Sequence, residues 1–276
     1  MPSPTADKCA AFHALHQQGC FILPNPWDTG SARYLQSLGF KALATTSSGM
    51  AWSHGLPDGS APLDLVLAHL REIVAATDLP VNADFENGYA ADAEGVGRNV
   101  RLAVDTGVAG LSIEDSTGNP AEPLFPIDVA VARLKAARSA IDAAGTGTLL
   151  VGRAENFIAG RPDLDDAIAR LRAYAQAGAD CLYAPGIRTR EQIAAVVAAV
   201  APKPVNLLVG TTSELSLADI AALGVRRISV GGALARAAWA GFIQTAQAVA
   251  QGRFDIAFAN AASGDALNGL FGPPRQ

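Results

Sequence analysis

Short apolar segments recur along the chain, and each is followed by a longer stretch in which apolar residues return every three or four positions. The short segments predict buried strands, and the longer stretches predict amphipathic helices. Eight strands are expected, over residues 20–27, 42–48, 80–86, 110–115, 148–155, 180–186, 204–210 and 227–232. Eight alternations of strand and helix indicate a parallel sheet covered by helices, and eight is the number at which such a sheet closes into a barrel.

The predicted fold class is therefore α/β, a (β/α)8 TIM-type barrel. A doubly wound open sheet is the competing fold, but the G-x-G-x-x-G that a dinucleotide site requires does not follow the first strand. We expect two additions to the barrel, an extra N-terminal helix near residues 5–18 and a C-terminal helical extension.

The chain is expected to form one domain. No linker rich in Pro, Gly or Ser divides it, so residues 1–276 are interpreted as a single barrel domain. The C-terminal segment, about residues 231–276, carries apolar residues that one ring of helices does not cover. We therefore expect this segment to pack on a neighbouring subunit or to be swapped with it.

Charge and cysteine content narrow the classes of partner. The formal net charge is -5 and the 21 basic residues are scattered, which argues against nucleic acid or a membrane surface and favours a small molecule. No apolar run reaches the roughly 18 residues of a membrane-spanning helix, and the polar N-terminus is unlike a signal peptide, so a cytoplasmic location is expected. Three sparse cysteines indicate reduced thiols, with Cys181 in the core.

Polar residues gather where the predicted strands end, which is where barrels of this kind carry their reacting groups. Residues two apart in a strand share a face, so the acids that close strand three point the same way. The strand ends and the long segment after strand two supply Asp84 and Glu86, Glu114 and Asp115, Arg153 and Glu155, Asn206 at the start of strand seven, and Ser47, Ser48, Gly49, His54 and Asp58.

Several acids around one arginine would repel one another strongly unless a cation lay among them. Because the ligands are all oxygens, Mg²⁺ is expected, with Mn²⁺ as the alternative. Mg²⁺ takes only one or two carboxylates directly, so Asp84 is the predicted direct ligand, and Asp58, Glu86 and Glu114 hold bound waters. A single strand-end acid more often caps a helix or pairs with an arginine, and Asp115 is the strongest case for that interpretation.

Five motifs resemble the isocitrate lyase and phosphoenolpyruvate mutase superfamily, in the same order and spacing from about residue 10 to the end: "NPWDTGSA", "TTSSGMAWSHGLPD", "VNADFENGYA", "GLSIEDS" and "VGRAENF". The resemblance implies an (α/β)8 barrel, usually a homotetramer built as a dimer of dimers with an exchanged C-terminal helix. It also implies Mg²⁺, a 2-oxo or 2-hydroxy carboxylate as substrate, and chemistry through an enolate.

The resemblance also assigns roles to individual residues. Asp84 matches the principal metal ligand, and Asp58, Glu86 and Glu114 match the supporting acids. Asp58, Glu114 and Arg153 are the predicted catalytic residues. The predicted substrate-binding residues are Trp27, Ser47, Ser48, Gly49, Met50, Arg153 and Asn206.

One loop departs from the pattern of the superfamily. Its lyases carry a Lys-Lys-Cys-Gly-His motif after strand four, whereas this chain has "DSTGNPAEPLFPID", without Lys, Cys or His. An ordinary isocitrate or 2-methylisocitrate lyase mechanism is therefore in doubt. The loop is still long and rich in Gly and Pro, as in a lid that closes over substrate, and Thr117 and Asn119 are its candidate substrate contacts.

Three functions remain open at this point. The first is a Mg²⁺-dependent carbon–carbon lyase acting on a small 2-hydroxy or 2-oxo di- or tricarboxylate, by cleavage of the isocitrate or 2-methylisocitrate type or by decarboxylation of the oxaloacetate type. The second is a mutase or hydrolase for the carbon–phosphorus bond of phosphonopyruvate, disfavoured because no lysine stands at a strand's carboxyl end. The third is a barrel that binds a 2-oxo acid without turning it over.

Overall fold

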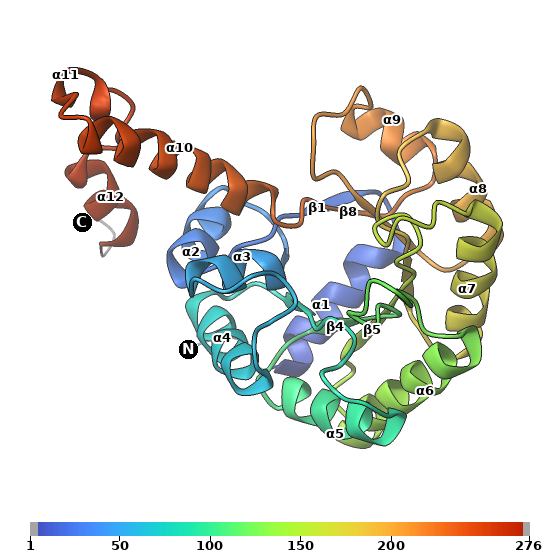
Figure 1. Cartoon of the computed structure of the whole chain (residues 1–276). Coiled ribbons are helices and arrows are strands. Elements are labelled where there is room, and N and C mark those ends of the chain that lie inside the picture. Colours follow the sequence, from blue (N-terminus) through green and yellow to red (C-terminus); the bar gives the residue numbers. More distant parts are fainter. Residues whose placement is uncertain (1–4, 273–276) are drawn as a thin grey trace.

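Eight parallel strands surround a common axis in the computed structural model, which describes residues 5–272 (Figure 1). Neighbours pair in the order β1-β8-β7-β6-β5-β4-β3-β2, so the strands follow one another around the barrel as they do along the chain. The predicted (β/α)8 barrel is confirmed. The strands are β1 (Phe21–Leu23), β2 (Leu43–Ala44), β3 (Val81–Asp84), β4 (Gly110–Glu114), β5 (Leu149–Arg153), β6 (Cys181–Tyr183), β7 (Val205–Leu208) and β8 (Arg227–Ser229).

The two ends of the sheet, β1 and β2, are joined by a side chain as well as by backbone. The amide of Ala44 donates to the carbonyl of Pro24 at 3.0 Å. Asn25 is 5% exposed, and its Nδ2 donates to the carbonyl of Thr45 at 2.9 Å. Its Oδ1 accepts from the amides that follow β8, of Val230 and Gly231, both at 2.9 Å. Asn25 therefore connects β1, β2 and β8 at the place where β1 and β2 form no ladder with each other.

Helices cover the outside of the barrel and begin at its carboxyl end. Polar residues at their N-caps accept a hydrogen bond from the amide three positions on, which satisfies one free helix donor each; they are Asp28, Asp92, Asp163, Thr189 and Ser216. The surrounding helices are α2 (Thr29–Ser37), α3 (Ser47–Ser53), α4 (Leu63–Ala76), α5 (Ala93–Val104), α6 (Ile127–Ala144), α7 (Leu164–Gln176), α8 (Arg190–Val200) and α9 (Leu217–Ala222). The sequence did not predict α3, which occupies the segment expected to be a loop.

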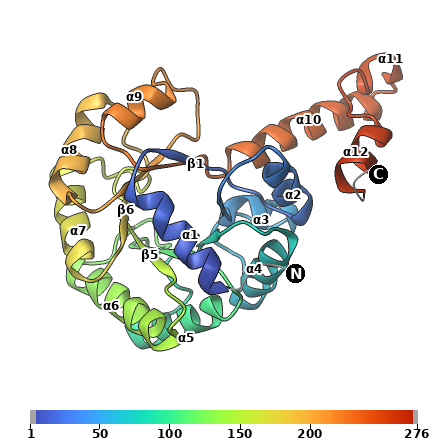
Figure 2. The ribbon, with the colours of Figure 1, turned by 180° about the vertical axis from the view of Figure 1, so that it is seen from behind.

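The N-terminal helix α1 (Thr5–Gln17) covers the amino end of the barrel (Figure 2). Its Phe12 is fully buried, and Lys8 Nζ donates to the carbonyl of Thr77 at 2.8 Å. Cys181 at the start of β6 is fully buried, as expected from the sequence. The interior is thus a packed core that is open only at the carboxyl end.

The C-terminal extension projects from the barrel as an arm (Figure 1). It consists of α10 (Ala233–Ala250), α11 (Phe254–Ala257) and α12 (Gly264–Phe271). Large apolar side chains stay exposed on it, including Phe242 at 62%, Phe254 at 66% and Phe258 at 57%. The last turn of α12 returns to the barrel, where Arg33 donates to the carbonyl of Phe271 at 3.0 Å. Packing of this arm on a neighbouring subunit stays a prediction.

Within residues 5–272, every helix is too short or too polar to cross a bilayer.

Candidate active site

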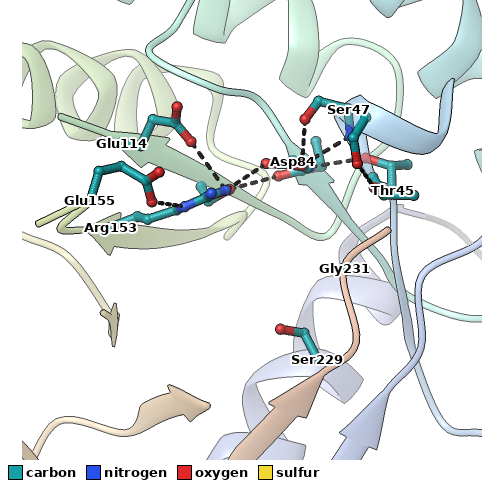
Figure 3. Close-up of polar contacts among 12 residues, drawn as sticks. Thr45, Ser47, Asp84, Glu114, Arg153, Glu155, Ser229 and Gly231 are labelled. Carbon is teal, nitrogen blue, oxygen red and sulfur yellow. Dashed lines mark hydrogen bonds and ion pairs between the residues drawn. The ribbon is translucent and has the colours of Figure 1, made fainter. Parts of the chain in front are cut away.

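Charged side chains from three neighbouring strands meet at the carboxyl end of the barrel (Figure 3). Asp84 ends β3, Glu114 ends β4 and Arg153 ends β5. Arg153 Nη1 lies 3.2 Å from Asp84 Oδ1 and 3.1 Å from Glu114 Oε2, and its Nε lies 2.5 Å from Glu155 Oε1. The predicted strand-end residues are therefore one cluster, because parallel strands bring their carboxyl ends to one rim.

Asp84 is held from the side of β2 as well. Its Oδ2 accepts from both the amide and the hydroxyl of Ser47 at 2.9 Å, and its own amide donates to Thr45 Oγ1 at 2.9 Å. Ser47 is presented by α3, which Thr46 caps by accepting from the amide of Gly49 at 3.3 Å. The carboxylate is thus fixed before any ligand binds, and Thr45 is a residue that the sequence analysis missed.

The other predicted residues of this segment lie around Ser47. Gly49 is required by space, because a Cβ there would lie 2.7 Å from Thr46 Cγ2 and 2.9 Å from the Cβ of Trp27. Trp27 therefore packs against the same turn, and Met50 is buried beneath it. Ser48 lines the cavity described below.

Glu86 follows β3 and is the least satisfied acid of the cluster. Its backbone has a φ of 43°, and its buried Oε1 has no hydrogen-bond partner among the described residues. Desolvation, and then the charges of Asp84 and Asp58, raise the pKa of Glu86 to about 7, while the Tyr89 hydroxyl and the charge of Arg153 oppose the change. A carboxyl group in this state binds either a proton or a cation readily near neutral pH.

The remaining acids show the same excess of negative charge. Desolvation raises the pKa of Glu114 well above its usual value, with Glu155, Asp84 and Glu86 adding to the effect and Arg153 opposing it. Desolvation and the charge of Asp84 also raise the pKa of Asp58, which stands on the loop after α3. One guanidinium does not compensate these carboxylates.

The donor set fits a hydrated divalent cation. Within residues 5–272, no three His, Cys, Asp or Glu side chains converge closely enough to bind an ion directly. Mg²⁺ does not require such a cage, since it keeps several waters and takes one or two carboxylates. The all-oxygen donors and the unpartnered Oε1 of Glu86 agree with binding of this kind.

A cavity of about 700 Å³ opens at the same end of the barrel, and Asp58 is the one acid of the cluster among the residues that line it. Ser48, Trp52 and Asp58 line one side of it, and the loops that follow β6, β7 and β8 line the other. This volume is within the range of small-molecule sites and accommodates a small carboxylate.

Asn206, Asp115 and the lid residues have partners of their own. Asn206 lies inside the barrel below the rim, where Nδ2 donates to Ser229 Oγ at 2.9 Å and Oδ1 accepts from Arg227 Nε at 2.8 Å. Its contact with substrate stays a prediction. Asp115 is 1% exposed and pairs with Arg170 at 3.0 Å, as the alternative interpretation expected. Thr117 and Asn119 are on the loop between β4 and α6, the predicted lid.

Two further residues near the cluster had not been assigned roles. His54 is exposed and its Nδ1 lies 3.0 Å from the carbonyl of Met50 in its own turn. Glu155 is 4% exposed and anchors Arg153, a role that its position two residues further along the same strand face could have suggested.

Comparison with known proteins adds a family and several relatives. The model of the family described as phosphoenolpyruvate phosphomutase matches residues 12–250. An oxaloacetate decarboxylase from Paraburkholderia xenovorans is 34% identical over 239 residues, which cover 82% of this chain and 75% of that protein. The 2-methylisocitrate lyase from Escherichia coli is 33% identical over 160 residues, which cover 55% of this chain and 53% of that protein.

Solved structures show that the likeness includes the arm. A protein from Burkholderia cenocepacia J2315, assigned provisionally as a lyase or mutase, has a TM-score of 0.94 at 47% identity over 98% of both chains. A 2,3-dimethylmalate lyase has a TM-score of 0.84 at 27% identity over 99% of this chain and 96% of that one.

Proposed function

The chain belongs to the phosphoenolpyruvate phosphomutase family and is a lyase, and we propose that it cleaves a carbon–carbon bond in a small 2-hydroxy or 2-oxo di- or tricarboxylate. One observation carries the proposal. Five carboxylates gather at the open end of the barrel, three of them (Asp84, Glu114 and Glu155) in contact with Arg153, and the pKa of Glu86 is raised to about 7. A site of this composition favours a divalent cation together with an anionic, oxygen-rich substrate.

The proposed cofactor is Mg²⁺, with Mn²⁺ as the alternative. Asp84 would hold it directly, and Asp58, Glu86 and Glu114 would hold it through water. When bound, the ion supplies a Lewis acid that stabilises negative charge developing on a substrate oxygen.

Arg153 is the proposed substrate-binding cation. Glu155 fixes its Nε, and Asp84 and Glu114 share its Nη1. Nη2 is used by none of these three contacts, so it is available to a substrate carboxylate at the rim. Because these contacts already fix the guanidinium, little further side-chain entropy is lost when it binds a carboxylate.

The lid is built to exclude water without supplying the proton. The two sides of the loop are joined by an antiparallel bridge between Ser116 and Leu124, and the amide of Thr117 donates to the carbonyl of Pro123 at 2.9 Å. This loop has no Lys, Cys or His, so it lacks the usual acid of the superfamily's lyases. Glu86 and Glu114, whose pKa values are raised by desolvation, are the proposed proton carriers.

A substrate panel tests this function. Purified protein with Mg²⁺ is expected to release pyruvate, glyoxylate or CO₂ from at least one of oxaloacetate, isocitrate, 2-methylisocitrate and dimethylmalate. Treatment with EDTA should abolish the activity, and Mg²⁺ or Mn²⁺ should restore it. Full turnover in EDTA would remove the metal from the mechanism.

Cleavage of a carbon–phosphorus bond is the second candidate, because the matching family model describes a phosphomutase. A phosphonate would need cations beyond Arg153. None of the four lysines stands at the carboxyl end of a strand, and Lys8 is bound to the carbonyl of Thr77 at the amino end of the barrel, but Arg188, Arg190 and Arg236 line the cavity and could supply such cations. Release of phosphate from phosphonopyruvate, with no product from the carboxylate panel, would establish this alternative. Stabilisation by 2-oxo acids without any turnover would instead indicate a binding protein.

We also propose that the arm packs on a second copy of this chain within a homotetramer. Its phenylalanines Phe242, Phe254 and Phe258 are each more than half exposed, and large apolar side chains exposed together are typical of an interface with another chain. Light scattering should give the mass of four chains. Replacing all three with Ser should reduce that mass, and a monomeric wild-type protein at micromolar concentration would contradict the assembly.

A further inference from the structure

The loop between β3 and α5 carries Glu86 into the site in an unfavourable backbone conformation. Glu86 has a φ of 43° and Tyr89 a φ of 53°, both in the left-handed region that residues other than glycine rarely adopt. Such conformations cost free energy and persist only where surrounding contacts fix them. The contacts that fix this loop therefore determine where the Glu86 carboxylate lies.

Two side chains from different helices bind every carbonyl of the loop from residue 87 to residue 91. Arg133 on α6 donates through Nη2 to the carbonyls of Asn87 at 2.7 Å and Ala90 at 2.8 Å, and through Nη1 to that of Ala91 at 3.2 Å. Asn99 on α5 donates to the remaining carbonyls, of Gly88 at 3.0 Å and Tyr89 at 2.8 Å. Together they leave no carbonyl of this stretch free to reorganise.

Arg133 is an unusual residue to find in this place. Its side chain is only 1% exposed, and burial lowers its pKa from the ordinary arginine value, although Asp92 opposes the change. Its hydrogen bonds go to neutral carbonyls rather than to a carboxylate. Burying a charge without an ion-pair partner is expensive, and an apolar residue would pack α6 against α5 at lower cost.

The same guanidinium also reaches the lid. Its central carbon lies 4.4 Å from the centroid of the Phe125 ring, at the end of the lid. At the start of the lid, Asn87 Nδ2 donates to the carbonyl of Ser116 at 3.1 Å. The loop that carries Glu86 is therefore connected to both ends of the segment that covers the site.

We propose that Arg133, together with Asn99, is a positioning residue that fixes the Glu86 loop against both ends of the lid and so sets the Glu86 carboxylate in the site. The functional half of this inference rests on the proposed metal-dependent activity. The structural half does not, because it concerns only how the two loops are held together.

Hydrogen–deuterium exchange tests the structural half. Arg133→Lys keeps a charge but loses the planar fork, and Arg133→Met loses both. Amides of residues 86–91 and 116–125 should exchange faster in the order wild type, Lys variant, Met variant. Asn99→Ala is the milder change and should speed exchange chiefly in residues 86–91. It replaces Arg133→Met in the test if that variant does not fold. Unchanged exchange in both segments in the Lys and Asn99 variants would overturn the proposal.

The matched control is Arg138→Met on the same helix. Arg138 pairs at 3.1 Å with Asp180, which precedes β6 at the opposite end of the barrel. This variant should lose stability without faster exchange in residues 86–91. If it accelerates exchange there as much as Arg133→Lys does, the effect is general loosening of α6 and the positioning role is wrong.

Direct titration with Mn²⁺ tests the functional half. Arg133→Lys should weaken Mn²⁺ binding about tenfold and lower kcat more than it raises KM for the substrate, because Arg133 does not reach the cavity. Faster exchange of residues 86–91 with unchanged Mn²⁺ affinity would overturn the inference that Arg133 and Asn99 set the position of the Glu86 carboxylate. Absence of Mn²⁺ binding by the wild type would instead contradict the proposed function. The exchange result would still decide whether Arg133 and Asn99 hold the loop.

Discussion

The two ends of this barrel both contain polar groups, but they are satisfied in different ways. At the carboxyl end, carboxylates outnumber the single Arg153, and Glu86 Oε1 has no partner among the described residues. Toward the amino end, the buried Arg227 donates to Asn206 at 2.8 Å and to Asn82 at 3.2 Å, and reaches His16 at 3.5 Å.

The difference separates what the barrel needs in order to fold from what it needs in order to act. Arg227 is bound by side chains of the barrel itself, so the hydrogen bonds of the lower cluster are made within the protein. The upper cluster keeps an excess of carboxylates, which the proposed cation would balance. Natural chains break the rules of polar satisfaction mainly at functional sites, and in barrels those sites are at the carboxyl end.

The largest effect is expected for Asp84→Ala. Turnover should fall by at least about a thousandfold, roughly 4 kcal/mol of transition-state stabilisation, because the proposed metal loses its direct ligand. Thermal denaturation should change little by comparison. Initial rates and melting curves check this prediction, and a rate within tenfold of wild type would exclude Asp84 from the mechanism.

Asp180→Asn is the control at the opposite end. Asp180 precedes β6, accepts from the amide of Leu150 at 2.8 Å and pairs with Arg138. Its replacement should cost stability and leave kcat/KM within about twofold. A large loss of activity would show that the two ends are not separable.

The second largest effect, on stability, is expected for Arg227→Met. The change leaves the amides of Asn206 and Asn82 without their donor in a closed interior, so the free energy of unfolding should fall by about 3 kcal/mol. Activity of the protein that folds should stay within a few-fold, and urea denaturation measures the loss. Undiminished stability would mean that Arg227 is as dispensable as an apolar residue of its size.

The sequence could predict the upper end better than the lower one. Strand spacing alone places Asp84, Glu114 and Arg153 on one rim, because parallel strands must end together. Nothing comparable fixes Arg133 or Arg227. Each is one arginine among many along the chain, and its partners come from segments that only tertiary packing brings near.

Short elements were the other limit of the sequence analysis. Helix α3 is seven residues long and rich in Ser and Gly, so its periodicity is too weak to distinguish it from a loop. The helix nevertheless begins at Ser47, whose amide donates a hydrogen bond to Asp84. The predicted substrate cradle is thus a helix start, whose Ser47 amide is taken by Asp84 and whose Gly49 amide is taken by the Thr46 cap.

A smaller effect, on stability, is expected for Glu86→Gln in metal-free protein. The pKa of Glu86 is raised from 4.5 to about 7, so the folded state favours the protonated form. The stability that this gives is complete below pH 4.5 and is lost as the pH rises through 7. At pH 8 the variant should therefore unfold with about 1 to 2 kcal/mol more free energy than wild type, and near pH 4.5 the two should agree.

Mg²⁺ should reverse that order. Wild type should gain stability on adding the ion at pH 8, while Glu86→Gln should gain less, because one supporting acid is missing. Equal gains in urea titrations would contradict a role for Glu86 near the metal.

His16 should give the opposite dependence on pH. Its Nδ1 donates to the carbonyl of Phe12 at 2.8 Å and its Nε2 faces Arg227, while Phe12 and Phe21 surround the ring. Desolvation, and then the charge of Arg227, lower the pKa of His16 from 6.5 to about 3. The folded state therefore excludes a proton that the unfolded chain binds.

The stability that neutral His16 contributes is thus complete above pH 6.5 and is lost as the pH falls toward 3, by about 1.4 kcal/mol per pH unit at most. His16→Gln should be the less stable protein at pH 7, because Gln fits the ring's place poorly, but its stability should fall less steeply between pH 6 and 4. Urea denaturation at pH 7, 6 and 5 measures the two slopes. Parallel slopes would mean that His16 takes up its proton without unfolding, and the contrast between a self-sufficient amino end and a ligand-dependent carboxyl end would then rest on Arg227 alone.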